Sequence, residues 1–302
     1  MIDATTALLA ALALLAVTFA IGWARVLWTA RPRSADPLAA ASSPLWTSLA
    51  IGAVTNFFDT LGVGSFAPTT AAFRALRLVP DRVIPGTLNV GHALPSVAQA
   101  LIFIAIVEVG PWTLATMVAA SMAGAWIGAG RVAGWNRTRV QAGMGMALLV
   151  ASAFMLRQIL AGAVGGEEAR SLSGAALAIG IAGNFVLGAL MTIGVGLYAP
   201  CMLLVTLLGM NAKAAFPIMM GSCAFLMPVA GWRFVTRGAY EAPVAVGLTL
   251  GGIPAVLVAA SLVQSLTLGA VRVLVLGVAV YTAVTMLRAA LTRGGAAGLT
   301  PS

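Results

Sequence analysis

Apolar runs of about twenty residues recur along most of this 302-residue chain. An α-helix needs a run of roughly that length to cross the hydrocarbon core of a bilayer. Hydrophobic residues make up 61% of the chain and charged residues only 8%, too few to cover the surface of a soluble domain. We therefore expect an all-α integral membrane protein. Full spans are expected near 5–28, 85–108, 111–133, 139–161, 214–235, 242–264 and 268–288.

Two further apolar stretches, 45–78 and 173–209, are too long for one span, and each contains nearly the same phrase. The first reads TLGVGSFAP at 60–68 and the second TIGVGLYAP at 192–200. Glycine and proline both disfavour the interior of a helix. The phrase therefore predicts that each stretch is a hairpin of two shorter helices that enters and leaves the membrane on one side.

The basic residues indicate how the spans are oriented. The 16 arginines and one lysine give a formal charge of +9, but they lie between apolar segments rather than in one patch, which argues against nucleic acid as a partner. With the N-terminus outside, 13 of the 17 lie in inside loops, and treating either hairpin as a single crossing removes this bias. We expect a multi-pass protein of the bacterial inner (plasma) membrane with a cytoplasmic C-terminus.

The two halves align at an offset of 132 residues. Gly62, Gly64 and Pro68 match Gly194, Gly196 and Pro200, and two further pairs of prolines follow in the same register. Each repeat crosses the membrane an odd number of times, so the second is inverted relative to the first. The expected divisions are an N-terminal helix and cytoplasmic loop at 1–44, repeats at 45–161 and 173–290, an outside loop at 162–172, and a cytoplasmic tail at 291–302.

Inverted repeats with broken helices are typical of secondary transporters, whose site lies near the midplane between the repeats. Glycines let backbone N–H groups turn toward a ligand, and a helix N-terminus attracts negative charge. The two turns therefore predict a site for one small anion. The expected substrate-binding residues are Asn56, Thr60, Gly62, Gly64, Ser65, Asn89, Asn184, Thr192, Gly194 and Gly196.

Several polar residues within the spans have two interpretations. Asp59 is either a proton carrier or a cap on the helix after the break. His92 shares one helix face with Asn89, Ser96 and Gln99, and this face either lines the substrate path or forms a hydrogen-bonded seam between helices. Because histidine titrates near neutral pH, His92 is the second candidate for proton coupling.

The same choice applies to other polar positions. Asn56 and Asn184 donate either to the ligand or to backbone groups freed by the broken helix. Arg157 and Arg272 lie near outer span ends, where they either snorkel to the interface or form a vestibule that gathers anions.

At the repeated phrase the sequence resembles the TauE/SafE family of sulfite exporters and sulfonate permeases. The family pattern is G-x-G-G-G followed by an apolar stretch and a proline, once per half. Here the third glycine of that pattern is replaced by Ser65 or Leu197. Gly86-Thr87 and Gly221-Ser222 resemble the small-residue patch that follows in the family, which adds Ser222 to the substrate-binding candidates. The resemblance covers 45–290.

These observations predict a secondary transporter that exports sulfite or a short organosulfonate together with protons. Uptake of organic anions and an anion channel are the alternatives. An enzyme is not expected, since the spans hold one histidine and one clearly intramembrane acid. Cys201 and Cys223 lack zinc-site spacing, so neither a metal nor a cofactor is expected. The expected partners are the anion, protons and lipid, with a homodimer left open.

The orientation can be tested by labelling from one face. A cysteine replacing Glu167 should react only with reagent added outside, and a cysteine replacing Ser302 only with reagent added inside. Reaction of the residue-167 cysteine from the inside would contradict the predicted topology.

Overall fold

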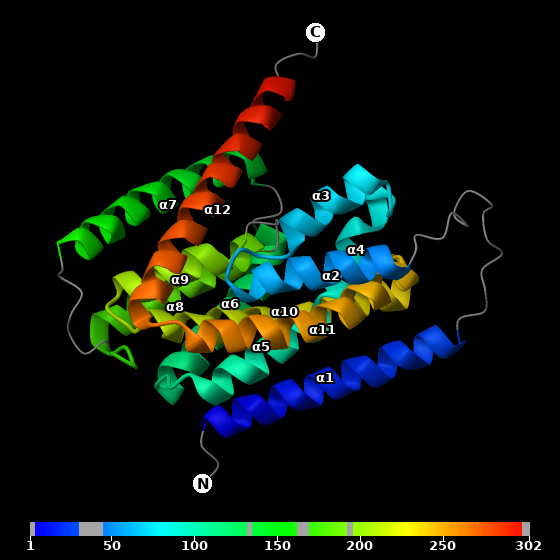
Figure 1. The fold of residues 1–302 in the computed structure, drawn as a ribbon, viewed down its shortest axis with the longest axis horizontal. Helices are drawn as coiled ribbons and strands as arrows, with labels where there is room; N and C mark the ends of the chain where they lie inside the picture. The colour runs from blue at the N-terminus through cyan, green and yellow to red at the C-terminus, as the bar shows by residue number, and fades with distance from the viewer. Residues whose placement is uncertain (1–3, 30–44, 132–134, 162–168, 192–195, 298–302) are drawn as a thin grey trace. The chain divides into compact units, whose positions relative to one another are not determined.

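The structure is a computed structural model that describes residues 4–29, 45–131, 135–161, 169–191 and 196–297. Within these ranges the chain is helical, and the only β-type pairing is an isolated bridge between Ala169 and Met210. The predicted all-α class is confirmed. In chain order (Figure 1) the helices are α1 (Ala4–Thr29), α2 (Leu45–Thr60), α3 (Phe66–Leu76), η1 (Asp81–Val83), α4 (Ile84–Gly91), α5 (Ala93–Ile106), α6 (Pro111–Arg131), α7 (Arg137–Leu160), α8 (Gly174–Met191), α9 (Tyr198–Leu207), η2 (Ala212–Ala214), α10 (Ala215–Arg237), α11 (Ala242–Ser265) and α12 (Leu268–Ala297).

Seven candidate spans in the described chain are long and apolar enough to cross a membrane. They are Ala4–Thr29, Asp81–Ile106, Thr138–Leu160, Gly174–Met191, Ala212–Arg237, Ala242–Ser265 and Leu268–Leu291. These findings support a multi-pass membrane protein. At 16 and 10 residues, α2 and α9 are shorter than a usual crossing. The 18 residues of α8 already reach that length. The first helix of the second hairpin is therefore as long as a full crossing, whereas the sequence predicted a shorter helix there.

Both breaks predicted from the repeated phrase are present. In the first half, α2 ends at Thr60 and α3 begins at Phe66. In the second, α8 ends at Met191 and α9 begins at Tyr198. Residues 192–195, which include the predicted Thr192 and Gly194, lie outside the described residues.

The predicted span at 85–108 corresponds to the candidate span Asp81–Ile106, and its helix is divided into α4 and α5 at His92, which the sequence did not predict. Pro95 causes the break: it has no N–H to donate to the carbonyl four residues earlier, that of Gly91. Thr249 of α11 donates its hydroxyl to this Gly91 oxygen at 2.8 Å. A neighbouring helix therefore satisfies the carbonyl that the proline leaves free.

The described helices form two compact units that cut across the sequence repeats. The first comprises residues 1–106 and 223–265, and the second residues 107–222 and 266–302. In the first unit α2 lies along α11 (Figure 1). Gly247 of α11 contacts Ser48 of α2, and Gly252 of α11 contacts Asn56 of α2. Because the later residue of one helix meets the later residue of the other, the two helices run parallel.

The N-terminal helix α1 packs against α5 in the first unit. Its Trp23 donates the indole N–H to the Tyr240 hydroxyl at 3.1 Å. Tyr240 lies in the connection between α10 and α11, and burial raises the pKa of its phenol above the usual value. This contact attaches α1 to the rest of the unit.

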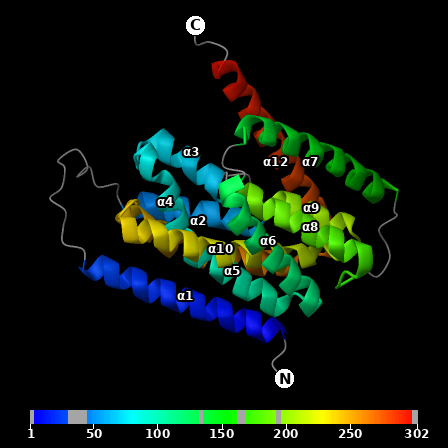
Figure 2. The same ribbon diagram turned by 180° about the vertical axis from the view of Figure 1, so that it is seen from behind.

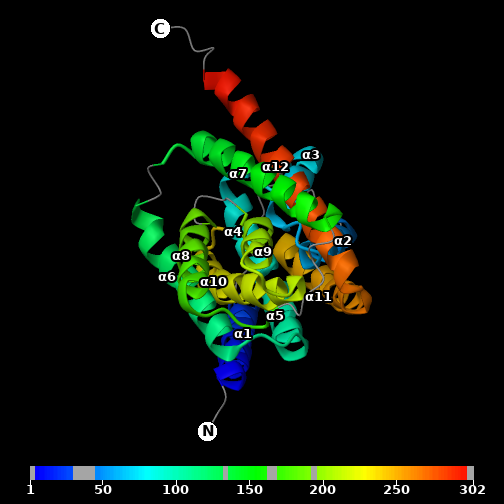
Figure 3. The same cartoon turned by 90° about the vertical axis from the view of Figure 1, so that its left-hand side faces the viewer.

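In the second unit α6 pairs with α8 (Figure 2), and α7 packs across α12 (Figure 3). Gly180 lies near Met117, and Gly188 lies against Ser121, so α6 and α8 also run parallel. Close approach of backbones at small residues is the usual way in which membrane helices associate.

This packing predicts which glycines tolerate a methyl group. A Cβ at Gly188 would overlap the Ser121 carbonyl oxygen, whereas a Cβ at Gly143 on α7 would meet nothing within 4 Å. Gly188→Ala should lower stability by about 1–3 kcal/mol, as overpacking does. Gly143→Ala should leave it unchanged or raise it by up to about 1 kcal/mol. Melting temperatures of the purified variants test this; equal melting would contradict the α6–α8 contact.

Candidate functional site

The turn between α2 and α3 owes its shape to two glycines with left-handed backbone conformations. Gly62 has φ of 99° and Gly64 has φ of 88°. The N–H of Gly62 donates to the Asp59 carbonyl at 2.8 Å and that of Val63 to the Phe58 carbonyl at 3.0 Å, which is the Schellman end of a helix. A Cβ at Gly64 would meet nothing within 4 Å, so conformation rather than space favours glycine there.

Asp59 lies at the end of α2 and is buried. The Gln99 side-chain amide of α5 donates to its Oδ2 at 2.9 Å, and Ser65 lies close enough to stabilise its charged form. Arg74–Asp81 and Arg170–Glu108 form ion pairs among the described residues, and neither pair contains Asp59. The structure thus surrounds this acid with neutral donors. Ser65 is also the N-cap residue of α3, which links Asp59 to the start of that helix.

His92 is fully buried between α2 and α3, and its contacts define its tautomer. Its Nδ1 lies 3.1 Å from Asn56 Oδ1, and its Nε2 lies 3.1 Å from Thr69 Oγ1. Because Asn56 Nδ2 donates to the Gly52 carbonyl at 2.8 Å, Asn56 presents an acceptor to the ring. Nδ1 must then carry the hydrogen, and Nε2 accepts from the Thr69 hydroxyl. All three side chains are satisfied with the imidazole neutral.

A second polar cluster lies in the other unit. Asn184 of α8 donates its side-chain amide to the Met117 carbonyl at 2.7 Å and to Ser222 Oγ at 3.2 Å. Ser222 in turn donates to the Ile218 carbonyl at 2.8 Å. Within the described part of the chain, the buried Asn184 Oδ1 and Ser121 Oγ have no hydrogen-bond partner.

The structure brings some of the predicted residues together and separates others. Asn56, Asp59, Thr60, Ser65 and His92 belong to the first cluster, and Asn184 and Ser222 to the second. Asn89 joins neither, because its amide donates to the Pro85 carbonyl of its own helix at 2.8 Å. Gly62 and Gly64 form the first turn, and Gly196 is exposed beside the start of α9.

Sequence reasoning missed Thr69 and Ser121 and did not choose Gln99 as a site residue. Gln99 was on the predicted polar face, and its bonds to Asp59 and Thr60 show what that face contacts. Thr69 directly follows the proline of the repeated phrase, which was an available signal. Ser121 has no comparable signal in the sequence.

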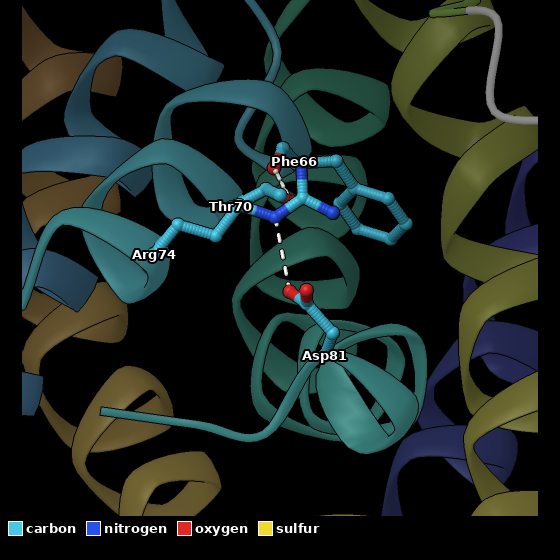
Figure 4. Close-up of polar contacts among 4 residues, drawn as sticks. All are labelled: Phe66, Thr70, Arg74 and Asp81. Carbon is cyan, nitrogen blue, oxygen red and sulfur yellow. Dashed lines mark hydrogen bonds and ion pairs between the residues drawn. The ribbon is translucent and has the colours of Figure 1, made fainter. Parts of the chain in front are cut away.

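The far end of α3 is attached to the following segment by an exposed ion pair. Arg74 Nε lies 3.0 Å from Asp81 Oδ1, while the Thr70 hydroxyl donates to the carbonyl of Phe66 in its own helix (Figure 4). α3 ends at Arg77, whose φ of 53° is left-handed. Exposed ion pairs contribute about 0–1 kcal/mol, so this contact orients α3 more than it stabilises it.

Comparison of the chain with models of protein families, with curated proteins and with solved structures gave no match.

The His92 contacts predict different effects of substitution at two adjacent threonines. Thr69→Val removes the hydroxyl that His92 Nε2 accepts from, and an unsatisfied buried acceptor costs about 1–3 kcal/mol. Thr70→Val removes a hydroxyl that bonds only its own helix backbone among the contacts described, so the change should be close to neutral. Thermal melting of both variants tests this; a Thr69→Val protein as stable as Thr70→Val would contradict the bond.

Proposed function

We propose that the protein is a secondary transporter that moves sulfite or a short organosulfonate across the plasma membrane by alternating access. The observation that carries the proposal is the glycine turn at the end of α2, which lies beside a buried acid with no cationic partner among the described residues. Such a combination is costly within apolar helices, and costly intramembrane groups usually serve function.

The proposal includes an inverted repeat. In each half, an asparagine on the first helix bonds a side chain 36 or 38 residues later: Asn56 with His92, and Asn184 with Ser222. In the first unit, α2 at the start of one half runs parallel to α11 of the other half, and in the second unit α8 does so with α6. These two correspondences support a common plan for both halves.

Each broken helix is proposed to offer a position for an anion at its first turn. α3 starts at Phe66 and α9 at Tyr198, and in neither does the N-cap side chain bond to the first turn. The first N–H groups of such a helix and its dipole together favour an anion. The resemblance of the repeated phrase to the TauE/SafE family supports a sulfur oxyanion as cargo.

Proton coupling is proposed to involve Asp59 rather than His92. The neutral imidazole already satisfies Asn56 and Thr69, which makes His92 a positioning residue. Asp59 and an anion a few ångströms apart would repel by several kcal/mol at an effective dielectric of about 20. The anion therefore binds favourably only when Asp59 is protonated. Binding of the anion and binding of the proton are thus coupled.

Export is proposed as the direction of transport. If more anions than protons leave in each cycle, an inside-negative potential drives the cargo outward with about 2.3 kcal/mol per net charge and 100 mV. We place the N-terminus outside and the C-terminus in the cytoplasm, as the arginine distribution suggests.

The role of Asp59 can be tested in proteoliposomes with an imposed pH gradient. Asp59→Asn mimics the protonated acid, so the variant should still bind the anion but transport it at a rate independent of pH. Asp81→Asn, which removes an exposed acid from the same unit, should retain the wild-type pH profile. A wild-type pH profile in Asp59→Asn would refute the coupling role.

A further inference from the structure

The interface between α6 and α8 contains two buried oxygen atoms with no hydrogen-bond partner among the described residues. They are Asn184 Oδ1 and Ser121 Oγ, and both residues are fully buried. Asn184 contacts the carbonyl of Met117, and Ser121 lies one helical turn beyond Met117 on the same helix. Gly188, one turn beyond Asn184, lies against Ser121. The two side chains therefore lie within about one turn of each other on facing helices.

The orientation of the Asn184 amide follows from its neighbours. Its Nδ2 lies 2.7 Å from the Met117 carbonyl oxygen and 3.2 Å from Ser222 Oγ. Ser222 uses its own hydrogen to donate to the Ile218 carbonyl, so it offers Asn184 only an acceptor. A flipped amide would place Oδ1 against two acceptors. Oδ1 is therefore the atom that Asn184 leaves for another molecule.

The two asparagines differ in what they can still bind. Asn56 Oδ1 accepts from His92, and Asn56 Nδ2 donates to Gly52. Asn184 Oδ1 accepts from nothing in the described chain. A buried acceptor left unsatisfied is unfavourable, and a ligand gains by supplying a hydrogen to it.

We propose that Asn184 Oδ1, assisted by Ser121 Oγ, accepts a hydrogen bond from the transported anion. This inference rests on the proposed function and specifies the substrate class. The cargo is an anion that carries an O–H or N–H donor beside its charged oxygens, such as hydrogen sulfite or a hydroxyl- or amino-substituted short sulfonate. An anion whose exposed atoms are all acceptors or apolar cannot supply this bond.

The test compares two monoanions that share a sulfonate group, 2-hydroxyethanesulfonate and ethanesulfonate. Their affinities for the purified full-length protein are measured by calorimetry in lipid nanodiscs. The wild type should bind the hydroxylated anion at least about tenfold more tightly, since a site built for a hydrogen bond rejects an analogue that lacks it. Asn184→Leu should abolish the preference by weakening only the hydroxylated anion.

Ser121→Ala removes a single oxygen and keeps the rest of the helix interface, so it tests the inference if Asn184→Leu fails to fold. It should reduce the preference roughly threefold, about half of the tenfold effect on a logarithmic scale. Ser152→Ala, which removes another unpartnered buried hydroxyl on α7, should leave the preference unchanged.

The outcomes separate the inference from the proposed function. Equal wild-type affinity for the two anions would overturn the inference while leaving anion transport intact. A preference that survives both Asn184→Leu and Ser121→Ala would also overturn it, and would indicate that Oδ1 faces a buried water. Binding of neither anion would overturn the inference, and lack of sulfite transport as well would overturn the proposed function.

Discussion

The structure depends on satisfying backbone polar groups where its helices break inside an apolar protein. Water does not reach such positions in a bilayer, so every freed N–H or C=O group needs a partner in the protein. The end of α2 is closed by the N–H groups of Gly62 and Val63, and the carbonyl freed by Pro95 accepts from Thr249. Ser65, at the start of α3, lies close to the Asp59 carboxyl group. The polar side chains that satisfy the breaks are also the ones that form the candidate site.

Close helix pairing makes these arrangements possible. A Cβ at Gly252 would lie 2.5 Å from Asn56 Nδ2, so α11 can pass the first cluster only because this residue is glycine. In the second unit, Gly188 allows α8 to approach α6 closely enough for Asn184 to reach the Met117 carbonyl. Packing and polar chemistry therefore depend on the same small residues. A transporter needs such a precisely packed site, because small displacements of binding groups change affinity strongly.

Sequence reasoning predicted the features that arise from local chemistry. The breaks after Thr60 and Met191 followed from glycine and proline within apolar runs, and the helical class followed from composition. The division at His92 was not predicted, although Pro95 within the 85–108 span was an available signal for it. The pairings of Asn56 with His92 and Asn184 with Ser222 depend on which helices come together, and helical spacing carries no such information. Spacing alone also placed Asn89 with His92, although Asn89 bonds its own helix.

The central claim is that this chain binds a small sulfur oxyanion and carries it by alternating access. Counterflow measures this most directly: proteoliposomes loaded with unlabelled sulfite are diluted into labelled sulfite, and uptake of the label is followed. The account predicts uptake that saturates with external sulfite and is faster with sulfite inside than without it. Uptake no greater than in protein-free liposomes would contradict transport of sulfite, and a flux that rises linearly without saturation would contradict alternating access.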